Sequence, residues 1–318
     1  MEPPYEINAA ILRLISSISI KIGEINANYI SKPSPQLRKQ NKIKTIHSSL
    51  QIEGNSLSEE QVTAIIENKR VIGGQKDILE VQNAILVYDN ISSFNPASEK
   101  SFLKAHKILM RNLVEKAGEY RIASVGIFKD SKIAHLAPPP QNVQYLMKEL
   151  FNYIKNYDEI ALIKSCVFHY EMEFIHPFLD GNGRMGRLWQ TLILSQEYPV
   201  FENLPFETLI NSTQNEYYEA LENSDKNGNS TEFIEYMLNV LEKSLTELLN
   251  FNNRTLTSNE RLEYFLSLNK KEFTRKDYMN LFKEISTSTA SRDLLQGVEN
   301  KKLIKIGSKN KTKYKPTT

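Results

Sequence analysis

The 318-residue sequence contains a single cysteine, a single tryptophan and no long apolar run. Because Cys166 has no second cysteine to pair with, an internal disulfide is excluded, and the composition fits a reducing compartment. No stretch approaches the roughly 18 uninterrupted apolar residues that a membrane helix needs. The start, Met1 to Pro4, lacks the basic and apolar parts of a signal peptide. We therefore expect a cytoplasmic protein with no membrane partner.

The formal net charge of +2 conceals an uneven distribution of charge along the chain. Residues 252–318 carry 15 Lys and Arg against 7 Asp and Glu, whereas residues 1–251 carry 25 against 31. Length alone predicts about two domains. We expect a domain over 1–251, a polar linker over 252–258 and a small domain over 259–318, with different partners for the acidic and basic parts.

Helical periodicity dominates residues 1–251, where apolar residues recur at three- and four-residue spacing. The first such set is Ile11, Leu14, Ile15, Ile18 and Ile22. A proline-containing break at 31–35 ends this helix, and Ser58 with Gln61 three residues later predicts a capping box. Further helices are expected over about 37–51, 58–68, 77–92, 98–113, 141–156, 159–175, 184–197, 206–223 and 230–251.

Residues 120–136 depart from the helical pattern. Val125, Ile127 and Ile133 flank a polar turn at 129–131, which predicts a short β-hairpin. The run Pro138-Pro139-Pro140 closes the hairpin, because proline cannot donate ladder hydrogen bonds.

The basic C-terminal part has a pattern of three helices and two short strands. The helices are expected over 259–268, 274–283 and 287–300, with the strands around 307–310. This order is typical of a winged helix-turn-helix domain. Seven lysines and no acidic residue lie between Lys301 and Lys315, and hydroxyl residues over 286–291 open the third helix, with Arg292 beyond. Such a surface predicts contact with a DNA phosphate backbone; a solvated basic tail and a target-recruiting module are the alternatives.

The segment from His176 to Arg187 combines an imidazole, a carboxylate, three glycines and two guanidinium groups within twelve residues. Its sequence is His-Pro-Phe-Leu-Asp-Gly-Asn-Gly-Arg-Met-Gly-Arg. Pro177 should end the preceding helix near Ile175, and the next helix should begin at Arg184. Gly181, Asn182 and Gly183 are therefore expected in the intervening loop.

The chemistry of this segment suits a phosphate ligand. Glycines allow successive backbone N–H groups to converge on an anion, and the helix that follows adds the positive end of its dipole. Arg184 and Arg187 share one face of that helix, where both can grip phosphate oxygens. Asp180 can hold Mg²⁺, which prefers oxygen ligands. His176 is then left as a general base, with an ordinary pKa of about 6.5.

Two other functions match parts of the same segment. Gly181, Gly183 and Gly186 fit the dinucleotide-binding fingerprint, but that fingerprint requires a preceding strand, and a helical pattern precedes it here. His169, Glu173 and His176 share one helical face, as in a metal hydrolase. They do not form H-E-x-x-H, and structural hydrogen bonding behind the site explains His169 and Glu173 more simply.

The twelve residues resemble the signature of the Fic family, in which His-x-Phe-x-Asp-Gly-Asn-Gly-Arg is followed by a second arginine three residues later. The resemblance extends to the Gly118-Glu119-Tyr120-Arg121 lead-in, the hairpin, the triple proline and the His169-Tyr170-Glu171 helix. It covers about residues 40–250. It implies a mainly α fold, a Fic-type helical bundle with a short β-hairpin flap, beside the winged helix-turn-helix domain.

For activity, the resemblance implies transfer of AMP from ATP to a Ser, Thr or Tyr hydroxyl of a target protein, with release of pyrophosphate. His176 would deprotonate the target, Asp180 would hold Mg²⁺ against the α- and β-phosphates, and Asn182 would orient the α-phosphate. Arg184 would bind the β-phosphate and Arg187 the γ-phosphate. The other nucleotide-binding positions would be Gly181, Gly183 and Gly186. The flap would register the target segment through Val125, Gly126, Ile127 and His135. An unspecialised surface hairpin is the alternative.

Ser49, Glu53 and Gly54 resemble an inhibitory motif of the same family. They lie on a helix expected over about 37–55. The resemblance implies that Glu53 pairs with Arg187 and keeps the γ-phosphate from its productive position. An ordinary helix end with a solvated glutamate is the alternative. The resemblance also implies self-modification and a homodimer. The main alternative function is a DNA-binding regulator whose Fic core senses nucleotide without modifying a target.

Overall fold

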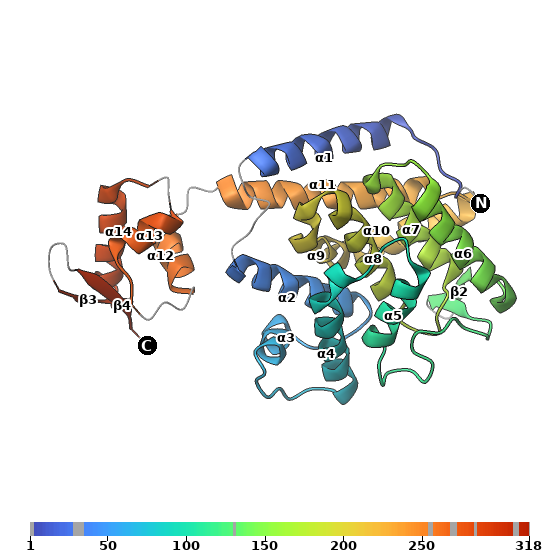
Figure 1. Ribbon diagram of the computed structural model, residues 1–318, viewed down its shortest axis with the longest axis horizontal. Helices are drawn as coiled ribbons and strands as arrows, with labels where there is room; N and C mark the ends of the chain where they lie inside the picture. Colours follow the sequence, from blue (N-terminus) through green and yellow to red (C-terminus); the bar gives the residue numbers. More distant parts are fainter. Residues whose placement is uncertain are drawn as a thin grey trace. The chain divides into compact units, whose positions relative to one another are not determined.

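The computed structural model describes residues 3–27, 35–129, 132–253, 257–267, 272–282, 285–307 and 312–317, and the chain divides into two compact units, 1–250 and 251–318 (Figure 1). The predictions of a mainly helical fold and of a short β-hairpin are confirmed. The first unit contains α1 (Ala9–Ala27), α2 (Pro35–Ile52), α3 (Glu59–Ile66), α4 (Gln75–Asp89), η1 (Ile91–Ser93), α5 (Glu99–Leu109), β1 (Gly126–Lys129), β2 (Lys132–Leu136), α6 (Pro140–Asn156), α7 (Ala161–Ile175), α8 (Asn182–Glu197), η2 (Pro199–Asn203), α9 (Glu207–Ser212), α10 (Gln214–Asn227) and α11 (Thr231–Asn253).

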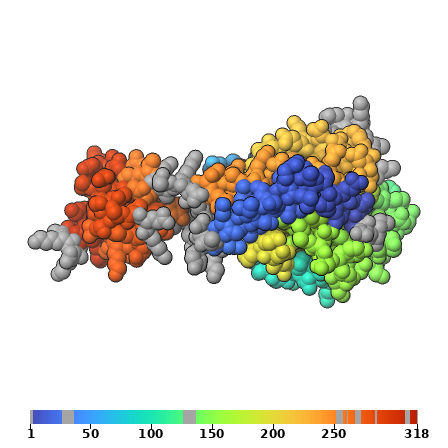
Figure 2. Space-filling model, turned by 90° about the horizontal axis from the view of Figure 1, so that it is seen from above, coloured from blue at the N-terminus to red at the C-terminus, as the bar shows by residue number. Residues whose placement is uncertain are grey.

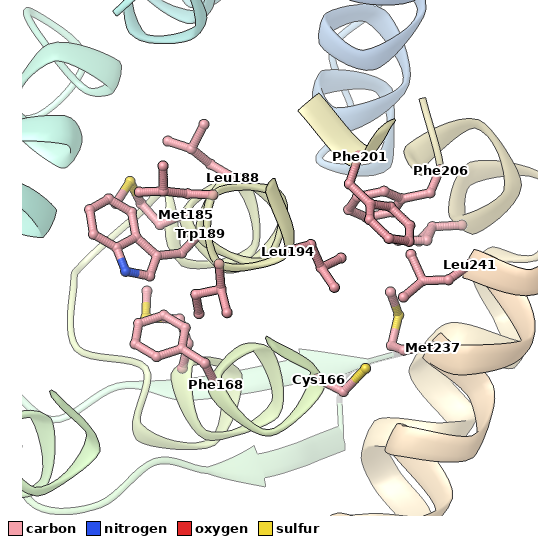
Figure 3. Packing of buried hydrophobic residues seen from close by; sticks show 14 of the residues in the cluster. Cys166, Phe168, Met185, Leu188, Trp189, Leu194, Phe201, Phe206, Met237 and Leu241 are labelled. Carbon is pink, nitrogen blue, oxygen red and sulfur yellow. The ribbon is translucent and has the colours of Figure 1, made fainter. Parts of the chain in front are cut away.

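Helices α7 and α8 form the centre of the first unit, and both are buried along most of their length. The rings of Phe168 on α7 and Trp189 on α8 lie with centroids 6.4 Å apart (Figure 3). Phe102 of α5 meets Trp189 edge to face, with centroids 5.0 Å apart. Cys166 is fully buried here, and burial raises the pKa of its thiol to about 12. The cysteine is therefore part of the apolar core.

Helix α1 lies along α11 on the surface of the first unit (Figure 2). Ser17 donates a hydrogen bond of 2.9 Å to Glu242, and Lys21 pairs with the same carboxylate at 3.0 Å. The apolar stripe predicted for this helix is buried at Ile11, Ile18, Ile22 and Ile25. The predicted break at 31–35 lies mostly outside the described residues.

Two of the predicted helical spans differ clearly from the structure. The helix expected over 98–113 stops at Leu109, and Asn112 then adopts a left-handed backbone with φ of 59°. The helix expected over 206–223 is two helices, broken at Thr213, whose hydroxyl bonds back to the Leu209 carbonyl at 2.8 Å. The capping box of Ser58 and Gln61 is present as predicted.

The second unit has its elements in the predicted order: α12 (Ser258–Ser267), α13 (Arg275–Leu281), α14 (Thr287–Glu299), β3 (Leu303–Ile306) and β4 (Lys313–Pro316). The two strands pair antiparallel, with Leu303 opposite Pro316. The unit has its own apolar core, which includes Leu262, Phe265, Tyr278, Leu294 and Leu303. Residues 308–311, between the two strands in the sequence, lie outside the described residues.

Candidate active site

The turn between α7 and α8 places His176 at the wall of a cavity. Helix α7 ends at Ile175, as predicted, because Pro177 cannot continue it. His176 adopts a left-handed backbone with φ of 49°, while its N–H still bonds to the Met172 carbonyl at 3.1 Å. This conformation is uncommon for a residue other than glycine and turns the chain sharply out of the helix.

Phe178 fixes the middle of this turn in the core. Its ring is fully buried and stacks on His106, with centroids 3.5 Å apart and planes inclined by 7°. His106 in turn accepts a hydrogen bond from the Gly118 N–H at Nδ1, so its Nε2 carries the proton and donates to the Asp180 carbonyl at 3.0 Å. Burial lowers the pKa of His106 to about 4, which keeps this link neutral and intact at physiological pH.

Helix α8 begins at Asn182, two residues earlier than predicted, so Asn182 and Gly183 belong to its first turn rather than to the loop. The Asn182 side chain explains the difference. It accepts a hydrogen bond from the Phe178 N–H and donates one to the Phe178 carbonyl, both at 2.9 Å. These two bonds join the turn to the first residue of the helix. Gly181 is the N-cap, with φ of 87°, and a Cβ there would meet Met110 at 2.7 Å.

Arg121, 3% exposed, ties the turn to the base of the hairpin. Its guanidinium donates to the carbonyls of His176 at 2.7 Å, Ala123 at 2.9 Å and Pro138 at 2.6 Å. Its backbone N–H bonds to the Pro177 carbonyl at 2.8 Å. The sequence singled out the lead-in that contains Arg121 only as part of a resemblance and assigned it no role.

The cavity has a volume of about 550 Å³. His176, Asp180 and the backbone of Gly181 to Gly183 form part of its wall, and α10 contributes Asn215 and Tyr218. The first backbone N–H groups of α8 therefore lie at the cavity, where the helix dipole favours an anion. This arrangement can hold a phosphate group beside an imidazole.

Asp180 lies at the same wall, with 42% of its side chain exposed. Its Oδ1 accepts from Arg184 Nη2 at 2.8 Å and from the Gly181 N–H at 2.6 Å. Among the described residues no group of three His, Cys, Asp or Glu is arranged to hold a metal by itself. A single exposed carboxylate fits Mg²⁺, which takes its other ligands from nucleotide phosphates and water.

Glu53, just after α2, pairs with Arg187 as the resemblance implied, and Ser49 near the end of α2 contacts the same guanidinium. Glu53 Oε1 accepts from Arg187 Nη2 at 2.7 Å, while the Ser49 hydroxyl and carbonyl accept from the same guanidinium at 3.1 and 2.9 Å. Burial lowers the pKa of Arg187, but the Glu53 carboxylate, together with Tyr217 and Glu173, outweighs this effect, so the pKa is raised. A Cβ at Gly183 would collide with Glu53 Oε1, so this carboxylate lies against the start of α8.

His169 has the structural surroundings that the simpler interpretation predicted, whereas Glu173 lines the cavity and accepts from the Tyr217 hydroxyl at 3.4 Å. His169 is fully buried, its Nδ1 donates to Gln190 Oε1 at 2.7 Å, and burial lowers its pKa to about 3. Gly186 faces this histidine, and a Cβ there would meet His169 Cδ2 at 2.6 Å. Gly186 is not among the residues that line the cavity, and neither are Arg184 and Arg187. The surroundings of Gly186 show close helix packing, and the expected nucleotide contacts of these three residues stay a prediction.

Comparison with known proteins gives the family. The sequence model of the Fic/DOC family matches residues 96–194. A crystal structure of a Fic family protein from Desulfovibrio desulfuricans G20 is 37% identical, with a TM-score of 0.79, over 100% of this chain and 98% of the other. The chain belongs to the Fic family. The matched segment contains the hairpin, α6, α7, the whole turn and most of α8.

Other Fic proteins resemble about three quarters of the chain. Fic-1 (residues 134–508) from C. elegans is 21% identical with a TM-score of 0.64, which shows a shared fold. Relatives named protein adenylyltransferase Fic are 26% identical over 249 residues in Nematostella vectensis and 25% over 248 residues in Drosophila erecta. These alignments cover 72% and 73% of this chain and 55% and 47% of the relatives, so the chain spans about half of their length.

The hairpin of this Fic chain is described through its backbone. Gly126 lies opposite Leu136 and Ile127 opposite His135, with an irregularity between Ile127 and Phe128. The side chains of Ile127 and His135, expected to contact a target, lie outside the described atoms, and Val125 is half-buried just before the strand. Within the described residues, no helix is long and apolar enough to cross a membrane.

Proposed function

We propose that this Fic protein transfers AMP from ATP to a hydroxyl side chain of a target protein and releases pyrophosphate. The observation that carries the proposal is one cavity wall on which the His176 side chain and the N-terminus of α8 lie together. The family membership and the names of the curated relatives support the same reaction.

In the proposed reaction the target hydroxyl oxygen forms a bond to the α-phosphorus, and the bond from that phosphorus to the β-phosphate oxygen breaks. His176 accepts the proton of the hydroxyl. The N–H groups at the start of α8 hold phosphate oxygens and stabilise their charge, so catalysis rests on positioning and electrostatics. Asp180 would hold Mg²⁺, which neutralises charge on the pyrophosphate that leaves.

We further propose that the Glu53–Arg187 pair inhibits the transfer. The two places that an ATP γ-phosphate needs, the Arg187 guanidinium and the start of α8, are both occupied by one carboxylate. Anions at a helix N-terminus and charge-assisted pairs with arginine are each favourable, so Glu53 competes directly with phosphate. A nucleotide displaced by about an ångström can lose ~100-fold in rate.

Intact-mass spectrometry of the Glu53→Gly protein tests the proposal. Incubation with ATP and Mg²⁺ should add the mass of one adenylyl group to the protein itself, and parallel incubations with UTP and GTP identify the donor. His176→Ala in the same background should abolish the gain. The absence of any mass gain, together with no transfer of label to proteins of a cell extract, would contradict transferase activity.

The target and the assembly belong to the same proposal. An extended target segment would pair with an edge of the β1–β2 hairpin and so bring its hydroxyl to His176. A homodimer is expected from the family resemblance. Light scattering after size exclusion measures its mass, and a monomer over the working concentration range would contradict it.

A second candidate function, DNA binding, is favoured by the surface of the C-terminal unit. Lys305, Lys313 and Lys315 are exposed on its hairpin, and Arg292 is exposed on α14. Exposed hydroxyl residues 286–288 open α14, where they can contact phosphates. Gel-shift titration of the full chain with duplex DNA across a salt series should show affinity that falls as salt rises. Binding that is absent or independent of salt would end this candidate, and His176→Ala should leave DNA binding unchanged.

A further inference from the structure

Glu80 is a buried carboxylate on α4 that lies between the inhibitory turn and the catalytic segment. It is 6% exposed. Its Oε2 accepts a hydrogen bond of 2.8 Å from Asn55 Nδ2, and its Oε1 lies 3.3 Å from Arg184 Nη1. The side chains of Asn55 and Arg184 are also buried. One carboxylate therefore joins the residue that follows Glu53-Gly54 to the first arginine of the motif.

Arg184 continues this chain of contacts to the cavity. While Nη1 lies at Glu80, Nη2 donates to Asp180 Oδ1 at 2.8 Å. The guanidinium is planar, so a partner at one end fixes the direction of the other. Asp180 is thereby held by one oxygen, Oδ1, in a fixed orientation at the cavity wall.

The ion pair between Glu80 and Arg184 is buried, unlike an ion pair at the protein surface. A buried charge is costly unless it is paired and hydrogen-bonded, and Glu80 and Arg184 satisfy one another away from water. Among the described residues, Asp180 is the only other acid that pairs with Arg184. Without Glu80, the positive charge of Arg184 would be balanced by Asp180 alone. Asp180 would then be a weaker ligand for a cation.

The turn at 53–55 thus reaches both motif arginines. Glu53 contacts Arg187 directly, and Asn55 contacts Arg184 through Glu80. Gly54 lies between them with φ of 88°, the backbone conformation that lets the two side chains diverge. A movement of this turn that releases Glu53 also alters the restraint on Glu80.

We propose that Glu80 is a positioning residue of the nucleotide site, which sets the affinity of Asp180 for magnesium through Arg184 and which Asn55 couples to the inhibitory turn. This rests on the proposed function, because Asp180 is the magnesium ligand there. Glu80 touches neither nucleotide nor metal. Its substitution should therefore change how much magnesium strengthens nucleotide binding more than it changes binding without metal.

Calorimetry with a non-hydrolysable ATP analogue tests this in the Glu53→Gly background, with Mg²⁺ and, separately, with EDTA. The ratio of the two affinities measures the gain from the metal. Glu80→Gln should reduce this gain by about 10-fold, the usual scale for outer-shell partners of a metal ligand, with a much smaller change in EDTA. Lys76→Gln is the matched control, because Lys76 approaches the same carboxylate from solvent at 3.9 Å and should leave the gain unchanged.

Asn55→Ala leaves all charges unchanged. It gives a second measurement of the magnesium gain if the Glu80→Gln variant does not fold. It should reduce the magnesium gain in the same direction by a smaller factor. An equal loss of affinity with and without Mg²⁺ in folded variants, or no loss in either, would overturn the role of Glu80 and leave the proposed function intact. A Glu53→Gly parent that binds no nucleotide would instead contradict the proposed function.

Discussion

The guanidinium of Arg121 donates to the carbonyl of His176 across 2.7 Å, although 54 residues separate the two in sequence. The same side chain reaches carbonyls at both ends of the hairpin segment, Ala123 and Pro138. The residue proposed as general base and the hairpin proposed to hold the target are therefore fixed to one buried cation. Their relative placement depends on it.

Arg121→Lys should lower AMP transfer in the Glu53→Gly background by about 10–100-fold, because a single ammonium cannot span these carbonyls and a shift of about an ångström is costly. The carbonyls left without a donor should also cost about 1–3 kcal/mol in the free energy of unfolding. Label incorporation and urea unfolding measure the two effects. Arg111→Lys, at an exposed arginine, is the control. Unchanged transfer would show that Arg121 does not position the turn.

Ser49→Ala should partly release the inhibition that we assign to Glu53. The substitution removes the hydroxyl that accepts from Arg187 Nε and leaves the Ser49 carbonyl and Glu53 in place. A hydrogen bond worth about 0.5–1.5 kcal/mol corresponds to a rise in self-modification of roughly 2–12-fold, below that of Glu53→Gly. Intact-mass time courses measure it, with Ser48→Ala, at a neighbouring buried serine, as the control. A rise equal to that of Glu53→Gly would contradict the central role of the carboxylate.

Alanine at two helical glycines should have opposite effects on stability. At Gly186 the new Cβ would lie 2.6 Å from a buried carbon of His169, so Gly186→Ala should destabilise the protein by about 1–3 kcal/mol. At Gly23, on α1, a Cβ would meet nothing within 4 Å, so Gly23→Ala should stabilise it by about 1 kcal/mol. Denaturant titration of both variants checks the pair. Equal effects would show that α7 and α8 do not need a glycine where they meet.

Glu207 predicts a pH dependence of stability. The side chain is fully buried, and burial raises its pKa from the ordinary 4.5 to about 8. Between these values the unfolded chain releases a proton that the folded chain retains, so this group lowers the stability progressively as pH rises from 4.5 to 8. Glu207→Gln should therefore gain stability over the wild type, by about 3–5 kcal/mol above pH 8 and little at pH 5.

Calorimetric unfolding at pH 5, 7 and 8.5 measures the difference between the Glu207→Gln variant and the wild type. Glu219→Gln, at an exposed glutamate of α10, is the control and should show no such trend. A constant difference across this range would mean that Glu207 is ionised in the folded protein throughout.

The sequence determined those features that depend on neighbours along the chain. Helical periodicity identified the elements, Pro177 gave the end of α7, and Ser58 with Gln61 gave a helix start, because each is a local constraint on the backbone. The motif from His176 to Arg187 also carried the family resemblance. Local spacing places such residues on one turn or one helix face whatever the rest of the fold does.

Tertiary structure decided which partner each polar side chain takes. Asn182 forms hydrogen bonds with the Phe178 backbone, and Glu80 contacts both Asn55 and Arg184. In the same way, His169 packs against Gly186, where there is no room for a Cβ. The last two cases bring together residues from separate helices. Buried hydrogen bonds and close packing depend on how helices meet in space, and the spacing of residues within one helix carries no record of that meeting.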